Sequence, residues 1–293
     1  MAQIFDENVL YIVSTPIGNL DDMTFRAVAV LKEATLILCE DTRHSRPLLK
    51  HFGVETKSRS YHDYNKEKVS EQYVKHIQEV GSIALISDAG TPAVADPGFF
   101  LTREAIRAGV KVVPIPGASA VLTGLVASGM PTDRFRFENF AAKKSSGRLR
   151  QFEELKTADS TVAMYLSPHH LLKVLDELNE VYGDIQIVLA RELTKKYEEF
   201  LRGTPAELLI HYEERSPKGE YVLYYDPRNK SGLDLNTDSN SHFETIMFPP
   251  TKVLDEVDIK TEDETKDSTH EKKSKFDPSK PKPQSKYARK KES

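Results

Sequence analysis

A short apolar run that stops abruptly in a loop of Gly, Pro and Asp is the feature that most constrains this chain. The run at residues 84–86 predicts the end of a buried strand, and residues 99–108 beyond the loop have helical spacing. A loop between a strand and a helix gathers exposed backbone N–H groups, and ligands bind at such points in open α/β sheets. Asp88 and Asp96 could accept hydrogen bonds from a ligand, or they could only cap their own backbone. Two adjacent turn clusters exceed what a connection needs, which favours the ligand site.

The same strand-to-loop pattern occurs earlier in the chain. Apolar runs at residues 9–13 and 35–39 predict buried strands, and polar loops follow them at residues 14–19 and 40–43. Because the ends of parallel strands lie on one edge of a sheet, we expect these loops to contribute to one site.

Strands and helices continue to alternate along the chain. The strand that leads into the central loop is expected to cover residues 82–87, and further strand candidates lie at residues 110–115, 136–140, 161–166, 185–191 and 220–226. Thr24 is expected to cap one of the intervening helices, with Phe25, Val28 and Leu31 on one face. The alternation is typical of mostly parallel α/β domains.

Length and this pattern predict two α/β domains, at residues 1–117 and 118–228. Beyond residue 228, polar residues, Pro and charge replace the periodic apolar residues. Such a segment cannot bury enough apolar surface to offset its ordering entropy, so we expect residues 229–293 to form a disordered tail.

Composition narrows the class of protein. The sequence is 39% hydrophobic with a formal net charge of −4, and it contains no apolar run near the roughly 18 residues of a membrane span. We therefore expect a cytoplasmic protein without a membrane segment. The single cysteine, Cys39, ends an apolar run and is expected to be a core residue, and the absence of His or Cys pairs at ligand spacing predicts no metal site.

Three blocks of sequence resemble a known family. The loop at residues 87–98 (Ser-Asp-Ala-Gly-Thr-Pro-Ala-Val-Ala-Asp-Pro-Gly) resembles the signature loop of the tetrapyrrole methylase superfamily. Two further blocks resemble its ribosomal RNA small subunit methyltransferase I branch, and they lie at residues 13–24 with 39–43 and at residues 114–120 with 128–134. Weaker similarity continues at residues 190–200 and 217–221, so the resemblance covers about residues 9–226.

This resemblance implies two α/β domains with a ligand cleft between them, and S-adenosylmethionine as the cofactor. The implied reaction is methylation of the ribose 2′-hydroxyl of a cytidine in 16S ribosomal RNA of the small ribosomal subunit, by a homodimer. Matching the family's cofactor loops places these residues against the cofactor: Pro16, Asp88, Gly90, Thr91, Val94, Ser119, Ala120, Tyr165, Leu166, Ala190 and Arg191. The glycine fingerprint of dinucleotide-binding folds does not occur in the sequence.

Methyl transfer to a ribose needs a weakly nucleophilic hydroxyl to lose or share its proton, and a positioned base is typically worth about 10²–10⁴-fold. Glu40, Asp41 and His44 are the candidate bases, and Arg43 suits a phosphate. Alternatively, Glu40 or Asp41 only pairs with Arg43 or caps the following helix. The reaction does not require a base from this loop, because positioning of the hydroxyl alone can supply much of the rate.

Charge in the first 228 residues favours a local RNA-binding patch. Acidic and basic residues after residue 228 cancel, which leaves the rest of the chain acidic overall. The basic loop at residues 143–150 is the best candidate for phosphate contacts, through Lys143, Lys144, Arg148 and Arg150. Alternatively, residues 143–150 form a solvated linker between the two domains and make no RNA contact.

Two segments depart from the family pattern, at residues 165–170 and 139–142. His169 and His170 in the first are expected to start a helix, whereas the second borders the expected RNA surface. Two other functions therefore stay open, a tetrapyrrole C-methyltransferase and a noncatalytic ribosome-binding homologue.

Overall fold

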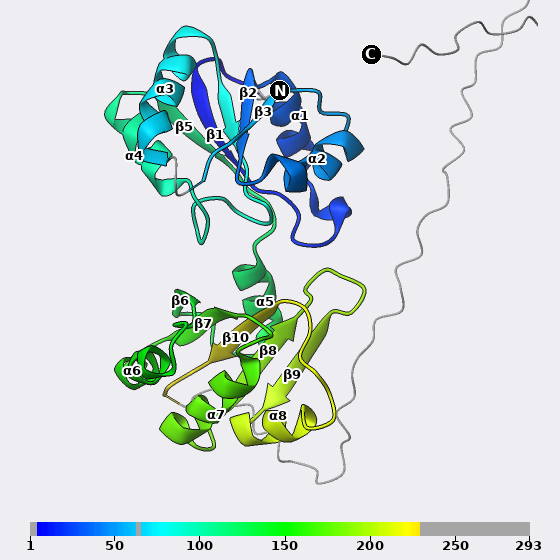
Figure 1. Ribbon diagram of the computed structural model, residues 1–293, viewed down its shortest axis with the longest axis vertical. Coiled ribbons are helices and arrows are strands. Elements are labelled where there is room, and N and C mark those ends of the chain that lie inside the picture. The colour runs from blue at the N-terminus through cyan, green and yellow to red at the C-terminus, as the bar shows by residue number, and fades with distance from the viewer. Residues whose placement is uncertain (1–4, 63–65, 229–293) are drawn as a thin grey trace, which may run out of the picture. The chain divides into compact units, whose positions relative to one another are not determined.

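The computed structural model describes residues 5–62 and 66–228, and the expected tail at residues 229–293 lies outside these residues (Figure 1). The described residues contain two five-stranded sheets, with strand orders β3-β2-β4-β1-β5 and β6-β7-β10-β8-β9. No helix in this part of the chain is long and apolar enough to cross a membrane.

The first sheet is parallel throughout. Its strands are β1 (Val9–Val13), β2 (Leu36–Cys39), β3 (Ser58–Ser60), β4 (Ile83–Leu85) and β5 (Lys111–Ile115). The helical segments are η1 (Leu20–Asp22), α1 (Phe25–Glu33), α2 (Thr42–His51), α3 (Lys66–Glu79) and α4 (Phe99–Arg107). Helices α1 and α2 cover one face and α3 and α4 the other, as buried parallel strands require (Figure 1).

The second sheet corrects the expectation of mostly parallel strands. Its strands are β6 (Phe135–Phe140), β7 (Thr161–Leu166), β8 (Ile187–Arg191), β9 (Glu199–Gly203) and β10 (Tyr221–Tyr225). Only β6 and β7 pair in parallel, because β10 runs antiparallel to both β7 and β8, and β9 antiparallel to β8. This sheet is therefore mixed.

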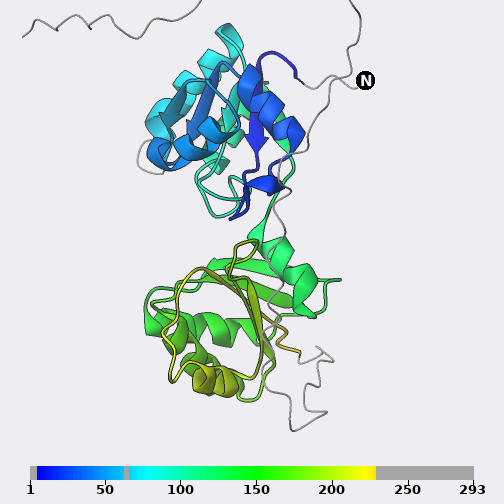
Figure 2. The same ribbon diagram turned by 90° about the vertical axis from the view of Figure 1, so that its right-hand side faces the viewer.

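Helices cover the second sheet unequally. They are α5 (Ala120–Ser128), α6 (Ser145–Leu155), α7 (Leu171–Tyr182) and α8 (Pro205–His211). Apolar side chains of α6, α7 and α8 share one core cluster with β7, β8 and β10, whereas α5 packs on the opposite face (Figures 1 and 2). The hydroxyl of Tyr224 on β10 donates to the carbonyl of Val121 at 2.9 Å and so joins the sheet to α5.

Helix α1 begins where the sequence predicts but buries a partly different face. The Thr24 hydroxyl accepts a hydrogen bond from the Ala27 N–H, which confirms the predicted cap. The buried residues are Ala27, Val30 and Leu31, whereas Phe25 is 98% exposed. Of the expected face, Leu31 is buried and Val28 half-buried, and only the placement of Phe25 was wrong, because the first residue of the helix lies away from the stripe that starts at Ala27.

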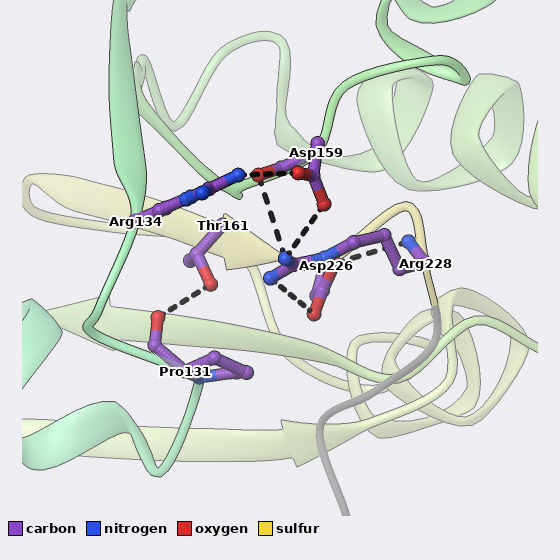
Figure 3. Close-up of polar contacts among 6 residues, drawn as sticks. All are labelled: Pro131, Arg134, Asp159, Thr161, Asp226 and Arg228. Carbon is purple, nitrogen blue, oxygen red and sulfur yellow. Dashed lines mark hydrogen bonds and ion pairs between the residues drawn. The ribbon is translucent and has the colours of Figure 1, made fainter.

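A polar network fixes the end of β10 (Figure 3). The buried Asp226 carboxylate accepts from Arg228 Nε at 2.8 Å, and Arg228 Nη1 pairs with Asp159 at 3.0 Å. Arg134, which directly precedes β6, also pairs with Asp159, at 2.6 Å. The network therefore ties the last strand to the segments that flank β6 and β7.

Candidate functional site

Hydrogen bonds join the loops that follow β1, β4 and β5. Thr15 and Gly90 exchange two backbone hydrogen bonds, with N–O distances of 2.9 and 3.1 Å. The Thr91 hydroxyl donates to the carbonyl of Ala118 at 3.1 Å and lies 3.0 Å from the Ser14 hydroxyl. The backbone N–H of Asp41, which follows β2, donates to the carboxylate of Asp88, which follows β4, at 3.3 Å. The expectation that the ends of β1, β2 and β4 meet is therefore confirmed, and the loop after β5 joins them.

Two glycines make the central loop possible. Gly90 has φ +80°, and a Cβ there would lie 3.2 Å from Ile17 Cγ2. A Cβ on Gly98 would lie 2.8 Å from the Cβ of Ala93. Glycine therefore permits both the left-handed turn and the close approach of the backbone.

A cavity of about 360 Å³ opens beside this loop, within the size range of small-molecule sites. Eight of the eleven predicted cofactor residues line it: Gly90, Thr91, Val94, Ser119, Ala120, Tyr165, Leu166 and Ala190. Their role in cofactor binding remains a prediction, but the structure brings them to one place.

The other three predicted cofactor residues lie outside the lining of this cavity. Pro16 is buried next to Ile17, which does line it. The Asp88 carboxylate accepts from the backbone N–H of Asp41 at 3.3 Å. Arg191 pairs with a carboxylate and donates to a backbone carbonyl, and both partners lie away from the cavity wall.

The sequence prediction missed much of the opposite wall. Phe140, Leu193, Lys195, Glu220, Tyr221 and Val222 all line the cavity. Val222 lies opposite Tyr165 on one side and Ala190 on the other, because β10 runs between β7 and β8. A strand so far along the chain carries no local signal of that position, although the predicted strand at residues 220–226 contained it.

Two carboxylates and one lysine give the cavity its charged groups: Asp96, Glu220 and Lys195. Burial raises the pKa of the Asp96 carboxyl, and the nearby charge of Asp88 adds to this increase. Burial, followed by the charges of Asp96 and Glu220, raises the pKa of Tyr165 to about 12, so its phenol keeps its proton at neutral pH. Glu220 lies 2.7 Å from Lys195 Nζ. The Glu220 charge is thus balanced by Lys195, and among these three groups Asp96 is the one whose carboxylate a positively charged ligand would favour.

The predicted catalytic residues lie at the start of α2. Asp41 is the N-cap residue, and its carboxylate lies 2.7 Å from the Arg43 guanidinium. Hydrogen bonds from the Arg43 side chain and backbone lower the pKa of Asp41 to about 2, so it is a poor base at neutral pH. The structure therefore shows the alternative expected for Asp41, in which it caps α2 and pairs with Arg43. Glu40 is partly buried and His44 is exposed. The described residues that line the cavity do not include any of the predicted catalytic residues, Glu40, Asp41, Arg43 and His44.

Residues 145–150 of the predicted basic loop are the first six residues of α6, and one of the cations, Arg148, is buried. Arg148 has a relative exposure of only 2% and forms two hydrogen bonds to the Glu177 carboxylate, at 2.6 and 2.7 Å. Its prediction as an RNA contact was wrong because this ion pair keeps the guanidinium inside the protein. Lys143, Lys144 and Arg150 are exposed.

Two other expectations are confirmed. Cys39 is buried in the first core, and burial raises the pKa of its thiol. His170 is the N-cap residue of α7, as expected for a helix start.

Comparisons with known proteins agree with this arrangement. The model of the family "Tetrapyrrole (Corrin/Porphyrin) Methylases" matches residues 9–209. Two solved structures share the fold: a diphthine synthase (TM-score 0.60, 17% identity, covering 74% of this chain and 89% of that chain) and a uroporphyrin-III-C-methyltransferase from Thermus thermophilus (TM-score 0.54, 18% identity, covering 74% and 94%).

Proteins related by sequence have a higher identity to this chain than these two structures do. "Ribosomal RNA small subunit methyltransferase I" of Halalkalibacterium halodurans is 47% identical over 74% of this chain and 75% of the relative. The proteins of the same name from Bacillus subtilis and Escherichia coli O157:H7 are 41% and 43% identical over 78% of this chain, and over 78% and 82% of their own lengths. The chain belongs to the tetrapyrrole methylase family, within its ribosomal RNA small subunit methyltransferase I branch, and is therefore a methyltransferase.

Proposed function

We propose that this protein transfers a methyl group from S-adenosylmethionine to the 2′-hydroxyl of a cytidine in 16S ribosomal RNA of the small subunit. The observation that carries the proposal is a cavity of about 360 Å³, built by the family's loops, in a chain 41–47% identical to enzymes named for small-subunit ribosomal RNA. The tetrapyrrole alternative has less support, since the uroporphyrin enzyme is only 18% identical.

The residues of the cavity fit this cofactor, which supplies a methyl group on a positively charged sulfur. Asp96 and Glu220 offer carboxylates for its positive groups, while Val94, Leu166 and Ala190 offer apolar surface. Ser119 lies at the N-terminus of α5, where backbone N–H groups suit a carboxylate.

For catalysis, Glu40 and His44 are the proposed bases. The low pKa of Asp41 argues for a positioning role, in which it holds Arg43 for a phosphate of the acceptor. Such positioning of the hydroxyl can supply much of the rate.

The remaining proposals concern partners and location. Lys143, Lys144 and Arg150 are proposed RNA contacts because their side chains are exposed. A homodimer in the cytoplasm is proposed from the family resemblance.

Labelled S-adenosylmethionine tests the reaction when the protein is incubated with unmethylated small subunits or with a porphyrinogen. We expect label in the RNA, at a linkage that resists alkaline cleavage because its 2′-oxygen is methylated. Label only in the porphyrinogen would establish the tetrapyrrole alternative, and label in neither would support the noncatalytic one.

A pair of glycine variants tests the cofactor site. Gly90 and Gly109 share positive φ angles of +80° and +74°, but a Cβ on Gly109 would meet nothing within 4 Å. Gly109→Ala should therefore lose about 1–2 kcal/mol of stability from its positive φ alone, and Gly90→Ala should lose this amount plus about 1–3 kcal/mol for the contact with Ile17. Only Gly90→Ala should weaken cofactor binding in calorimetry, by about 5- to 100-fold, because the new methyl overpacks the loop against Ile17. Equal affinities would contradict the placement.

A further inference from the structure

Helix α2 presents a row of cations to solvent. Arg43, Arg46 and Lys50 occupy positions i, i+3 and i+7, so they lie on one face of the helix, and all three are exposed. The opposite side of the helix, with Ser45 and Leu49, is buried. The row spans about 10 Å at a rise of 1.5 Å per residue.

The charge of this row is weakly compensated. The helix contains no Asp or Glu, and its two histidines, His44 and His51, lie beside the row and are also exposed. Among the side chains that the structure describes, which leave out residues 63–68, the ion pairs of α2 are limited to Arg43 with Asp41, and Arg46 and Lys50 have no carboxylate partner there. Exposed cations on other elements, such as Arg107 and Lys111, do have such partners.

The helix starts beside the cavity. Its N-cap residue, Asp41, donates its backbone N–H to Asp88, and the next two residues after Asp88 line the cavity. Strand β2, which leads into α2, pairs with β4, which leads into the cavity loop. A strand of RNA with its acceptor nucleoside beside the cofactor cavity could therefore continue along α2.

We propose that Arg43, Arg46 and Lys50 form a docking row for the phosphates of the RNA that flanks the methylated nucleotide. This inference rests on the proposed function and names how its substrate is held. Arginine offers a planar fork that fits phosphate oxygens. The exposed Asp41–Arg43 pair is screened by salt and can exchange its carboxylate for a phosphate. Because residues 1–228 carry a net charge of −4, attraction to RNA must come from local rows such as this one.

The test compares two double variants of the full chain that each remove two exposed cations. Arg46→Gln with Lys50→Gln changes α2 and leaves Arg43 in place. Lys75→Gln with Arg107→Gln is the matched control, since these residues lie on α3 and α4, on the other face of the sheet. Binding to unmethylated small subunits is measured between about 50 and 200 mM salt.

The α2 double variant should lose about 1.4 (single-stranded contacts) to 1.8 (duplex contacts) from the slope of log affinity against log salt. Its KM for subunits should rise while kcat at saturation and cofactor affinity stay unchanged. A second variant, Arg46→Lys with Lys50→Arg, keeps both charges and should keep most of the slope.

Several results would overturn the inference. An unchanged slope in the α2 variant, or an equal loss in the control, would show that the row makes no specific contact. A loss with whole subunits but none with isolated small-subunit RNA would assign the row to a ribosomal protein. If the wild type methylates no subunits, the proposed function itself is wrong. If the wild type methylates subunits and the α2 variant binds them as tightly as the wild type does, only the docking row is wrong.

Discussion

Two basic segments of this chain look alike in sequence but differ in the structure. Residues 43–50 and 143–150 each carry at least three Lys or Arg side chains in eight positions. On α2 all of these side chains are exposed, whereas in the second segment Arg148 is buried and paired with Glu177. The number of cations in a segment therefore does not tell which are available to a ligand, because that depends on a partner elsewhere in the chain.

The buried arginine has a role in shaping the cavity wall. Besides Glu177, its Nη1 donates to the carbonyls of Ala142 and Lys143, at 3.0 and 2.9 Å. These carbonyls follow Phe140, which lines the cavity and packs its ring 5.2 Å from that of Tyr165. Arg148 thus fixes the segment that connects the cavity wall to α6.

The largest expected effect on stability comes from removing this arginine. Arg148→Ala leaves the Glu177 carboxylate buried without its partner, which should lower the free energy of unfolding by about 3–5 kcal/mol. Arg46→Ala on α2 should stay within about 0.5 kcal/mol of the wild type. Urea denaturation of both variants measures the difference, and equal losses would remove the distinction between the two segments.

The pH dependence of stability should separate the segments further. Burial raises the pKa of Glu177, but hydrogen bonds from Arg148 and Ser145, with the charges of Arg148 and Lys173, lower it below its ordinary value of 4.5. A carboxyl with a lowered pKa stabilises the fold above its unfolded pKa and loses that contribution as pH falls through the folded value.

The difference in unfolding free energy between wild type and Glu177→Gln should therefore be largest near neutral pH and shrink below about pH 4.5. Urea titrations at several pH values measure it. A difference that stays constant down to pH 3 would contradict a stabilising role for the ionised pair.

The first cavity wall could be predicted from sequence because its information is local. The loops after β1, β4 and β5 carry their own turn residues, and the parallel order of the strands brings them together. The second wall depends on β10 lying antiparallel between β7 and β8, which no short stretch encodes. The edge strand β3 was missed because Ser58–Ser60 lacks apolar residues.

The burial of Arg148 could not be predicted for a related reason. Its partner, Glu177, lies 29 positions later on another helix, so local charge alone suggested an exposed patch. The sequence of α2, in contrast, contains no acidic residue that could pair within the helix, and there exposure agrees with the local pattern.

The smallest expected effect on stability belongs to the exposed remainder of the second segment. Replacing Lys143, Lys144 and Arg150 by Ala should change the unfolding free energy by less than about 0.5 kcal/mol each. Arg150 Nε lies 3.8 Å from Glu154 Oε1, and like the Asp41–Arg43 pair it would have to exchange this carboxylate for a phosphate, so the salt slope is estimated for the two lysines alone. If both contact RNA, the triple variant should lose about 1.4–1.8 from the salt slope of subunit binding, with cofactor affinity unchanged. An unchanged slope here, together with a reduced slope in the α2 variant, would make this segment a solvated connection and leave α2 as the docking row.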